Sequence, residues 1–307
     1  MKKVLTFFIF ISIIRVDAVA QQFPLLSQYM FNGLVLNPAY AGSKPFTSAS
    51  IDIRKQWAGF EGSPTTQAAT IHGLTDGKKV GLGFMISNDK VGVQNQTDVF
   101  GSYAFHISNR RYKFSLGLQG GFTYLRSQIS DLKYWQNGDP VYAINTLSNV
   151  QPNVGFGAYL YSDFYYAGLS APYLLSYDPQ QGASVDLAQS HHVARHIFLT
   201  GGYVIELTEQ IKLKPSVLVK YIYAAPVQAD VNASVLLNNI IWIGASYRTN
   251  DAVVAIAEYQ LTKKLRLGYS FDFTLSEIQK YSAGSHEFML AYDFGYKLQK
   301  VRTPRYF

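Results

Sequence analysis

The sequence predicts an all-β fold, a transmembrane antiparallel up-and-down β-barrel of about 14 strands. Three observations carry this prediction. Residues 1–20 have the make-up of an export signal, apolar and polar residues alternate with a period of two along the rest of the chain, and no long apolar run interrupts that alternation. A bilayer accepts only structures that satisfy every backbone polar group, so strands of this kind must close into a barrel.

The N-terminal segment predicts export. Lys2 and Lys3 supply a positive region, residues 4–14 an apolar core, and residues 18–20 a small-residue cleavage site. An apolar core of ~11 residues is too short to span a bilayer as a helix. We therefore expect a cleaved signal peptide and a mature start at Gln21; the alternative is an interfacial anchor that stays attached.

The composition excludes several classes of site. The chain has no cysteine, which excludes disulfides, thiolate metal sites, cysteine nucleophiles and a lipid anchor on cysteine. Its 15% of charged residues lies below the typical ~25%, and its 23 tyrosines suit aromatic belts at a membrane–water boundary. The net charge of +7 is spread along the chain and gives no nucleic-acid footprint.

Fourteen segments alternate in this way and form the expected barrel, residues 47–296. In chain order they are residues 47–57, 65–73, 79–87, 97–107, 112–125, 153–161, 163–170, 196–206, 211–223, 226–237, 240–248, 251–260, 263–274 and 285–296. Each is long enough to cross about 25 Å of hydrocarbon when tilted. Pro215 lies inside one of them, so we expect a bulge or a local loss of strand pairing there.

The charged residues of these segments fall on one face. Lys212, Lys214 and Lys220 share one face of their segment, opposite valine, leucine and isoleucine. One Lys or Arg at the bilayer midplane on the lipid face costs ~2–4 kcal/mol, so the charged face is expected to line the lumen. The lumenal acids expected to pair with Arg248, Lys264 and Arg266 are Asp230, Glu258, Asp272, Glu287 and Asp293. Such an interior is either a salt-bridged, closed lumen or a selective pore.

The connections between strands differ systematically in length. Every even-numbered connection is short, whereas five odd-numbered ones are long: residues 58–64, 88–96, 126–152, 171–195 and 275–284. Outer-membrane barrels pair short periplasmic turns with longer outside loops, and this spacing argues against a soluble β-sandwich. We therefore expect the long connections outside the cell and both ends of the barrel sequence in the periplasm.

Two segments flank the barrel. Residues 21–46 carry large aromatic residues without a strand to join, and we expect them either to plug the lumen or to dock a periplasmic partner. Residues 297–307 hold four cations and no acid, so this basic tail is either solvated or docks on an acidic face. The terminal Phe307 resembles the C-terminal aromatic residue by which bacterial outer-membrane barrels are recognised for insertion.

No constellation of catalytic or metal-binding residues emerges. His191, His192 and His196 form a histidine cluster, and a solvated loop accounts for it better than a metal site, because no acid lies between them. Ser285 and His286 are adjacent in a strand and face opposite ways, which excludes their pairing in a hydrolase. We therefore expect no enzyme, no metal site and no cofactor.

Three segments resemble, in order, the motifs of a known family. They are residues 28–43 (QYMFNGLVLNPAYAGS), residues 54–67 (RKQWAGFEGSPTTQ) and residues 281–290 (YSAGSHEFML). The second matches the pattern R-x-Q-W-x-G-F-x-G-x-P-x-T, and the third matches G-S-H-E-I-M-L with Phe288 in place of isoleucine. The chain thereby resembles the PorP/SprF family of Bacteroidetes over its whole mature length.

The resemblance implies a non-catalytic, integral outer-membrane component of the type IX secretion system that supports secretion, surface anchoring or export of a gliding-motility adhesin. It implies outer-membrane lipid and the secretion machinery or a secreted client as partners; no nucleic acid or small-molecule substrate is expected. The rival function is an outer-membrane channel or transporter for small or hydrophobic molecules. The candidate partner-binding residues are Tyr29, Phe31, Asn37, Tyr40, Trp57, Phe60, Tyr134 and Trp135.

Overall fold

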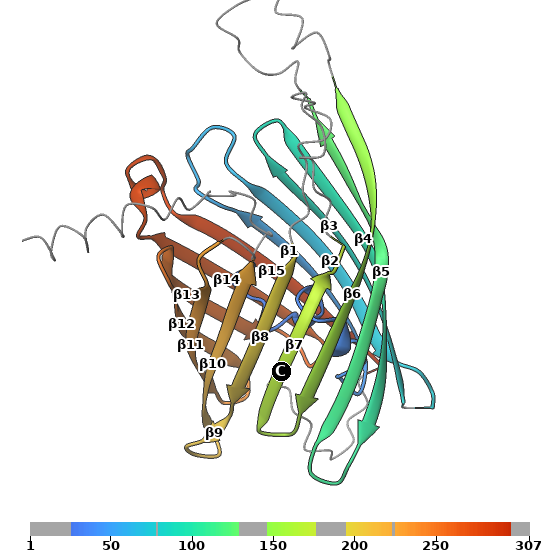
Figure 1. The fold of residues 1–307 in the computed structure, drawn as a ribbon. Coiled ribbons are helices and arrows are strands. Elements are labelled where there is room, and N and C mark those ends of the chain that lie inside the picture. Colours follow the sequence, from blue (N-terminus) through green and yellow to red (C-terminus); the bar gives the residue numbers. More distant parts are fainter. Residues whose placement is uncertain (1–25, 78, 129–145, 176–194, 223–224, 296–307) are drawn as a thin grey trace, which may run out of the picture.

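The computed structural model describes residues 26–77, 79–128, 146–175, 195–222 and 225–295. They form a closed antiparallel barrel in which each crossing strand pairs with the next, and the last strand, β15, pairs with the first, β1 (Figure 1). Within this part of the chain, fourteen strands form the wall. The two-residue β9 is counted with β8, because both pair with β10 and β9 continues the line of β8. The predicted fold class is confirmed.

All fourteen expected strands are present. They are β1 (Thr47–Lys55), β2 (Thr65–Leu74), β3 (Val80–Val91), β4 (Gln94–Ser108), β5 (Lys113–Ser127), β6 (Leu147–Tyr161), β7 (Tyr165–Tyr173), β8 (His196–Tyr203) with β9 (Ile205–Glu206), β10 (Ile211–Ile222), β11 (Gln228–Leu237), β12 (Ile241–Arg248), β13 (Ala252–Gln260), β14 (Leu265–Thr274) and β15 (Ser285–Phe294). The largest difference is at β6, which begins at Leu147 and not at residue 153. We call the end with the β1–β2, β3–β4 and β5–β6 connections the long-loop end, and the opposite end the short-turn end. The long connection predicted at residues 88–96 is wrong, because β3 and β4 continue further than expected and only residues 92–93 join them.

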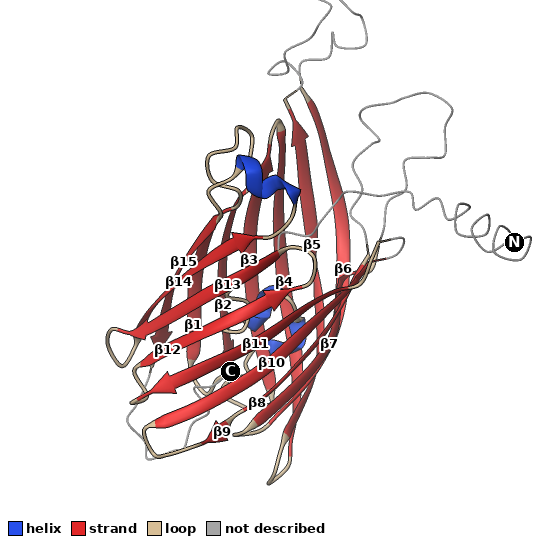
Figure 2. Cartoon of the chain, turned by 90° about the vertical axis from the view of Figure 1, so that its left-hand side faces the viewer, coloured by secondary structure: helices blue, strands red, loops and turns tan. Residues whose placement is uncertain are grey.

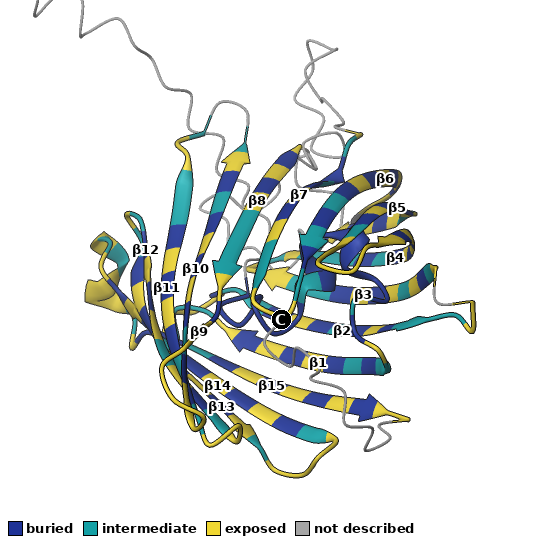
Figure 3. Cartoon of the chain, turned by 90° about the horizontal axis from the view of Figure 1, so that it is seen from below, coloured by how far each residue is buried: buried dark blue, intermediate teal, exposed yellow. Residues whose placement is uncertain are grey.

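Side chains alternate between the two faces of the wall (Figure 3). In β15, Phe288 and Leu290 are exposed on the outer face, whereas Glu287 and Met289 are buried on the inner face. A soluble β-sandwich would bury its apolar face instead. The outer surface of the barrel is therefore suited to lipid. No helix among the described residues is long and apolar enough to cross a membrane.

The strand pairing is interrupted opposite Pro215, as the sequence predicts. In β10, Ser216 pairs with Gly202 of β8 and Leu213 pairs with Ile205 of β9, and the positions between them are unpaired on that side. Proline has no backbone N–H to donate to a neighbouring strand. The missing donor accounts for the gap that separates β8 from β9.

The lumen holds the N-terminal segment, residues 26–46, which we call the plug (Figure 2). It contains two short 3-10 helices, η1 (Gly33–Val35) and η2 (Pro38–Tyr40). Near its start, Ser27 contacts the beginning of β15, at the long-loop end; near its finish, Lys44 contacts the beginning of β1, at the short-turn end. The described part of the plug therefore runs along the barrel, inside the lumen.

Candidate functional site

The plug lies against inward-facing glycines of the wall. A Cβ atom added to Gly117 would overlap the backbone of Ala39, so only glycine lets the two backbones approach this closely. The closest contacts of this kind are Gly81 with Ala41, Gly117 with Ala39, Gly157 with the side chain of Asn37, and Gly268 with the side chain of Gln28. The wall is thus shaped to receive this backbone path.

A buried carboxylate anchors the start of the plug. Glu287 accepts hydrogen bonds from the backbone N–H groups of Ser27, at 2.6 Å, and Gln28, at 2.9 Å. The same carboxylate pairs with Nη1 of Arg54 at 3.2 Å, and Nη2 of Arg54 pairs with Asp272 at 2.7 Å. The side chains of Arg54, Asp272 and Glu287 are 0–3% exposed. Burial of this kind is tolerated only when each charge is paired and hydrogen-bonded.

Arg248 completes this cluster, which we call the anchor. Its Nε pairs with Asp230 at 3.1 Å and its Nη1 pairs with Asp272 at 3.2 Å. Its Nη2 donates to the hydroxyl of Ser27 at 3.2 Å. Two guanidinium groups and three carboxylates from five strands therefore converge on the first residues of the plug.

The expected ion pairs are only partly as predicted. Arg248 and Arg266 do pair with lumenal acids, and Arg266 lies 3.3 Å from Glu258 and 3.7 Å from Asp293. Lys264 is a wrong prediction, because β14 begins one residue later and Lys264 is exposed in the preceding turn, outside the ion pairs of the described chain. Sequence reasoning missed Arg54. The available signal was that it shares the parity of Asp52, on the polar face of the first strand.

The anchor joins all three of the sequence motifs. Gln28 belongs to the first motif, Arg54 to the second and Glu287 to the third. Gln28 and Arg54 both bond the carboxylate of Glu287, although Gln28 and Glu287 are 259 residues apart in the sequence. The second and third motifs also meet at the rim, where Ala58 N–H donates to Gly284 at 2.7 Å. These motifs therefore specify how the plug, the first strand and the last strand fit together.

The four predicted site residues of the plug are all buried in the lumen. Tyr29 accepts a hydrogen bond from Asn232 at 2.7 Å, and Asn37 donates to the carbonyl of Ala158 at 3.0 Å. Tyr40 makes edge contacts with wall side chains, and Phe31 packs near a tryptophan of β12. In this conformation they serve the plug, and none of the four lies on a surface that a partner reaches.

The remaining predicted residues belong to the long-loop end. Trp57 and Phe60 follow β1, and Phe60 is 44% exposed. Trp57 adopts a left-handed φ of 50° and its N–H donates to the hydroxyl of Ser285 at 3.1 Å, which fixes the turn. Tyr134 and Trp135 lie outside the described residues. Among the predicted residues that are described, Phe60 is therefore the exposed candidate for contact with a partner.

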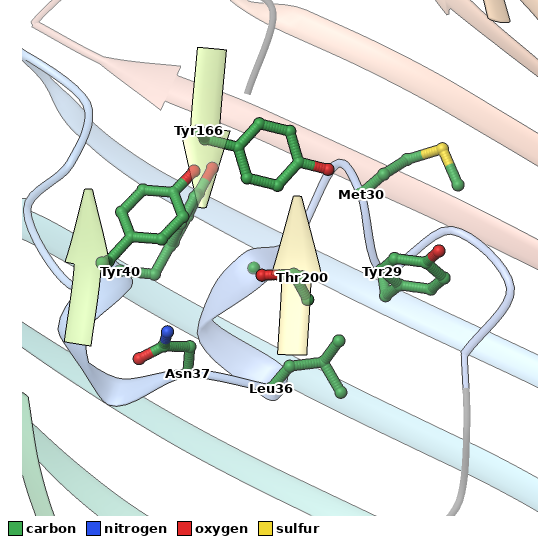
Figure 4. Close-up of a pocket in the computed structure, with 9 residues that line it drawn as sticks. Tyr29, Met30, Leu36, Asn37, Tyr40, Tyr166 and Thr200 are labelled. Carbon is green, nitrogen blue, oxygen red and sulfur yellow. The ribbon is translucent and has the colours of Figure 1, made fainter. Parts of the chain in front are cut away.

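Little free space remains between the plug and the wall. The cavity in Figure 4 has a volume of about 30 Å³ and is lined by residues including Tyr29, Tyr40, Tyr166 and Thr200. This is room for a water molecule or two, and pockets for drug-sized ligands are about 300–1,000 Å³. Burial raises the pKa of both Tyr29 and Tyr40, so these phenols stay neutral. This cavity is therefore too small for a ligand of that size.

Among the described residues, His196 and the Ser285–His286 pair show no catalytic arrangement. His196 is buried at the start of β8, and His191 and His192 lie outside the described residues. Within the described chain, no group of three or more His, Asp or Glu side chains could hold a metal ion. The hydroxyl of Ser285 points inward, whereas His286 contacts the Tyr269 hydroxyl on the outer face at 2.8 Å.

A closed barrel with an apolar outer surface, a charged inner surface and a filled lumen defines the class of outer-membrane β-barrel proteins. The chain belongs to the family of the type IX secretion system membrane protein PorP/SprF, whose model matches residues 18–292. The family and this fold are typically non-enzymatic. The predicted family is thereby confirmed, and so is the outer membrane as its location.

Solved structures of other bacterial proteins are similar to the chain. The chain is similar to the toluene transporter TbuX of Ralstonia pickettii, with a TM-score of 0.52, 9% identity, and coverage of 85% of this chain and 92% of that one. It is also similar to Omp33 of Acinetobacter baumannii, with a TM-score of 0.48, 7% identity, and coverage of 82% and 100%. At 9% identity, the likeness to TbuX shows the fold alone. No curated protein matches the sequence.

Proposed function

We propose that this protein is a non-catalytic scaffold of the type IX secretion system, a barrel that presents surfaces to partner proteins and does not conduct. The observation that carries the proposal is the anchor. All three motifs are used to hold the plug inside the barrel, and a channel would need that space open. The proposal covers secretion, surface anchoring of a client and export of an adhesin for gliding motility.

The proposal assigns the two ends of the barrel to different partners. The long-loop end faces outside, by the usual asymmetry of outer-membrane barrels, and offers Phe60, Trp57 and the loop with Tyr134 and Trp135 to a secreted client. The short-turn end and the basic tail, residues 297–307, face the periplasmic machinery. Export by a cleaved signal peptide belongs to the same proposal.

Conductance in a planar lipid bilayer tests whether the barrel is a scaffold or a channel. The purified full-length protein is expected to show no steady open-pore current, because the plug fills the lumen. A steady current of the size that an open barrel of this width carries would contradict the scaffold and favour the rival channel for small or hydrophobic molecules.

Site-specific cross-linking in the native host tests the assignment of the ends. A photo-reactive residue at Phe60 is expected to capture a secreted client, whereas the same residue at Lys263, exposed at the short-turn end, is expected to capture periplasmic proteins. Capture of the same proteins from both positions would contradict the assignment.

A further inference from the structure

Two tight turns lie next to each other at the short-turn end (Figure 1). In the β4–β5 turn, Asn109 N–H donates to Tyr112 at 2.9 Å, and the Asn109 side chain accepts from Arg110 N–H at 2.6 Å. In the β6–β7 turn, Ser162 N–H donates to Tyr165 at 2.8 Å, and its hydroxyl accepts two further N–H groups. Both turns therefore hold their side chains on a fixed backbone.

A notch of about 190 Å³ separates the two turns. Three cations, Arg110, Arg111 and Lys113, line it with one acid, Asp163. None of these four side chains takes part in an ion pair with any other residue that the structure describes. Three positive charges against one negative charge leave the notch with a net charge of +2, so it favours an anion.

The position of the notch matches the level of lipid phosphates. The strand that enters the first turn ends in outward-facing Phe105 and Ile107, which are 42% and 52% exposed, so the lipid-facing surface runs up to the notch. Exposed aromatic residues, Tyr112 and Phe164, flank it in the manner of an interfacial belt. A volume of about 190 Å³ suits a phosphodiester group and is below that of pockets for drug-sized molecules, about 300–1,000 Å³.

We propose that this notch binds the phosphate group of an anionic phospholipid in the leaflet at the short-turn end. Arg110 and Arg111 supply planar, forked donors that fit phosphate oxygens, and Lys113 adds a point charge. The proposal is independent of the secretion role, because it concerns how the barrel is held in its bilayer.

Native mass spectrometry of the full-length protein in detergent tests this site. Added phosphatidylglycerol is expected to bind the native protein at least about tenfold more tightly than the variant Arg110→Ser/Arg111→Ser/Lys113→Ser. The matched control is Lys263→Ser/Lys264→Ser, which removes two exposed cations from another turn of the same end and is expected to bind as the native protein does. A second variant, Arg110→Lys/Arg111→Lys, keeps the charge, loses the fork and is expected to show an intermediate affinity.

Four outcomes would overturn the proposal. One is equal affinity of phosphatidylglycerol for the native protein and the triple variant, in samples whose unheated electrophoretic mobility shows a folded barrel. Another is equal binding of zwitterionic phosphatidylcholine. The third is that inorganic phosphate alone binds with the same arginine dependence while the lipid adds nothing, which would assign the notch to a free anion; capture of an acidic peptide in place of lipid would count in the same way.

Discussion

Replacing Glu287 by glutamine should release the start of the plug. The carboxylate accepts from Ser27 N–H at 2.6 Å and Gln28 N–H at 2.9 Å, and it pairs with Arg54 at 3.2 Å. Glutamine has the shape of glutamate but only one acceptor oxygen. Its NH2 group would face donors that the second carboxylate oxygen accepts from in the native protein. If the amide nitrogen takes the place of Oε2, the hydrogen bonds from Ser27 N–H and from Arg54 Nη1 are lost and the one from Gln28 N–H remains, at about 1.5–3 kcal/mol for each bond lost. Breaking a buried ion pair costs about 3–5 kcal/mol. We therefore expect Glu287→Gln to lower the free energy of unfolding by about 3–5 kcal/mol.

The measurement is equilibrium unfolding in urea of the protein in lipid vesicles, together with conductance in a planar bilayer. Glu287→Gln should lower the urea midpoint and introduce intermittent current. The matched control is Glu277→Gln, which breaks the exposed 2.7 Å pair with Lys280. Exposed pairs contribute about 0–1 kcal/mol, so the control should stay near the native midpoint and remain silent. Equal behaviour of the two variants would refute the anchoring role of Glu287.

Three further predictions concern the plug and the orientation of the barrel. Gly117→Val should raise conductance, because the valine side chain would occupy the place of Ala39 and displace the plug. The control Gly120→Val faces open space on the outer surface and should leave conductance unchanged. Equal currents from the two variants would contradict the fit of the plug against the wall. Burial, reinforced by a neighbouring arginine, lowers the pKa of Lys44 from 10.5 to about 7, so the folded state binds fewer protons and stability should rise between about pH 7 and 10.5. Lys44→Met should flatten that rise in urea midpoints, and an unchanged slope would speak against it. A tag near Asn137 should be stained by antibody on intact cells, and staining after permeabilisation alone would reverse the orientation.

The sequence was sufficient for the strands because a barrel wall imposes one rule on every strand. Inward and outward side chains differ in polarity, so the period of two is visible residue by residue. The rule loses force at strand ends, where Lys264 follows the alternation and yet belongs to the turn. The rule also placed the start of β6 too late, at residue 153 in place of Leu147. Pro152 lies in this first part of the strand, and proline disfavours strand assignment.

The path of the plug could not be read from the sequence. Large aromatic residues outside any strand indicated that residues 21–46 need a place to be buried. The lumen could be predicted as that place, but the route of the chain through it could not. Which glycines receive which plug residues depends on contacts between distant strands. The pairing of Arg54 with Glu287 needs the closure of β1 against β15, which no local pattern contains.

That closure has a consequence for how the protein is assembled. Arg54 lies on the first strand and Glu287 on the last, so the anchor sits across the seam that turns an open sheet into a barrel. Bringing together residues this far apart in the sequence carries a loop-closure cost, which slows folding. The N-terminal segment is enclosed by the last strand, and the same residues, Arg54 and Glu287, both join the two sides of the seam and hold the plug. A chain that closed without its plug would keep the ion pairs of its seam but lose the N–H groups of Ser27 and Gln28, and the carboxylate of Glu287 would need water in their place.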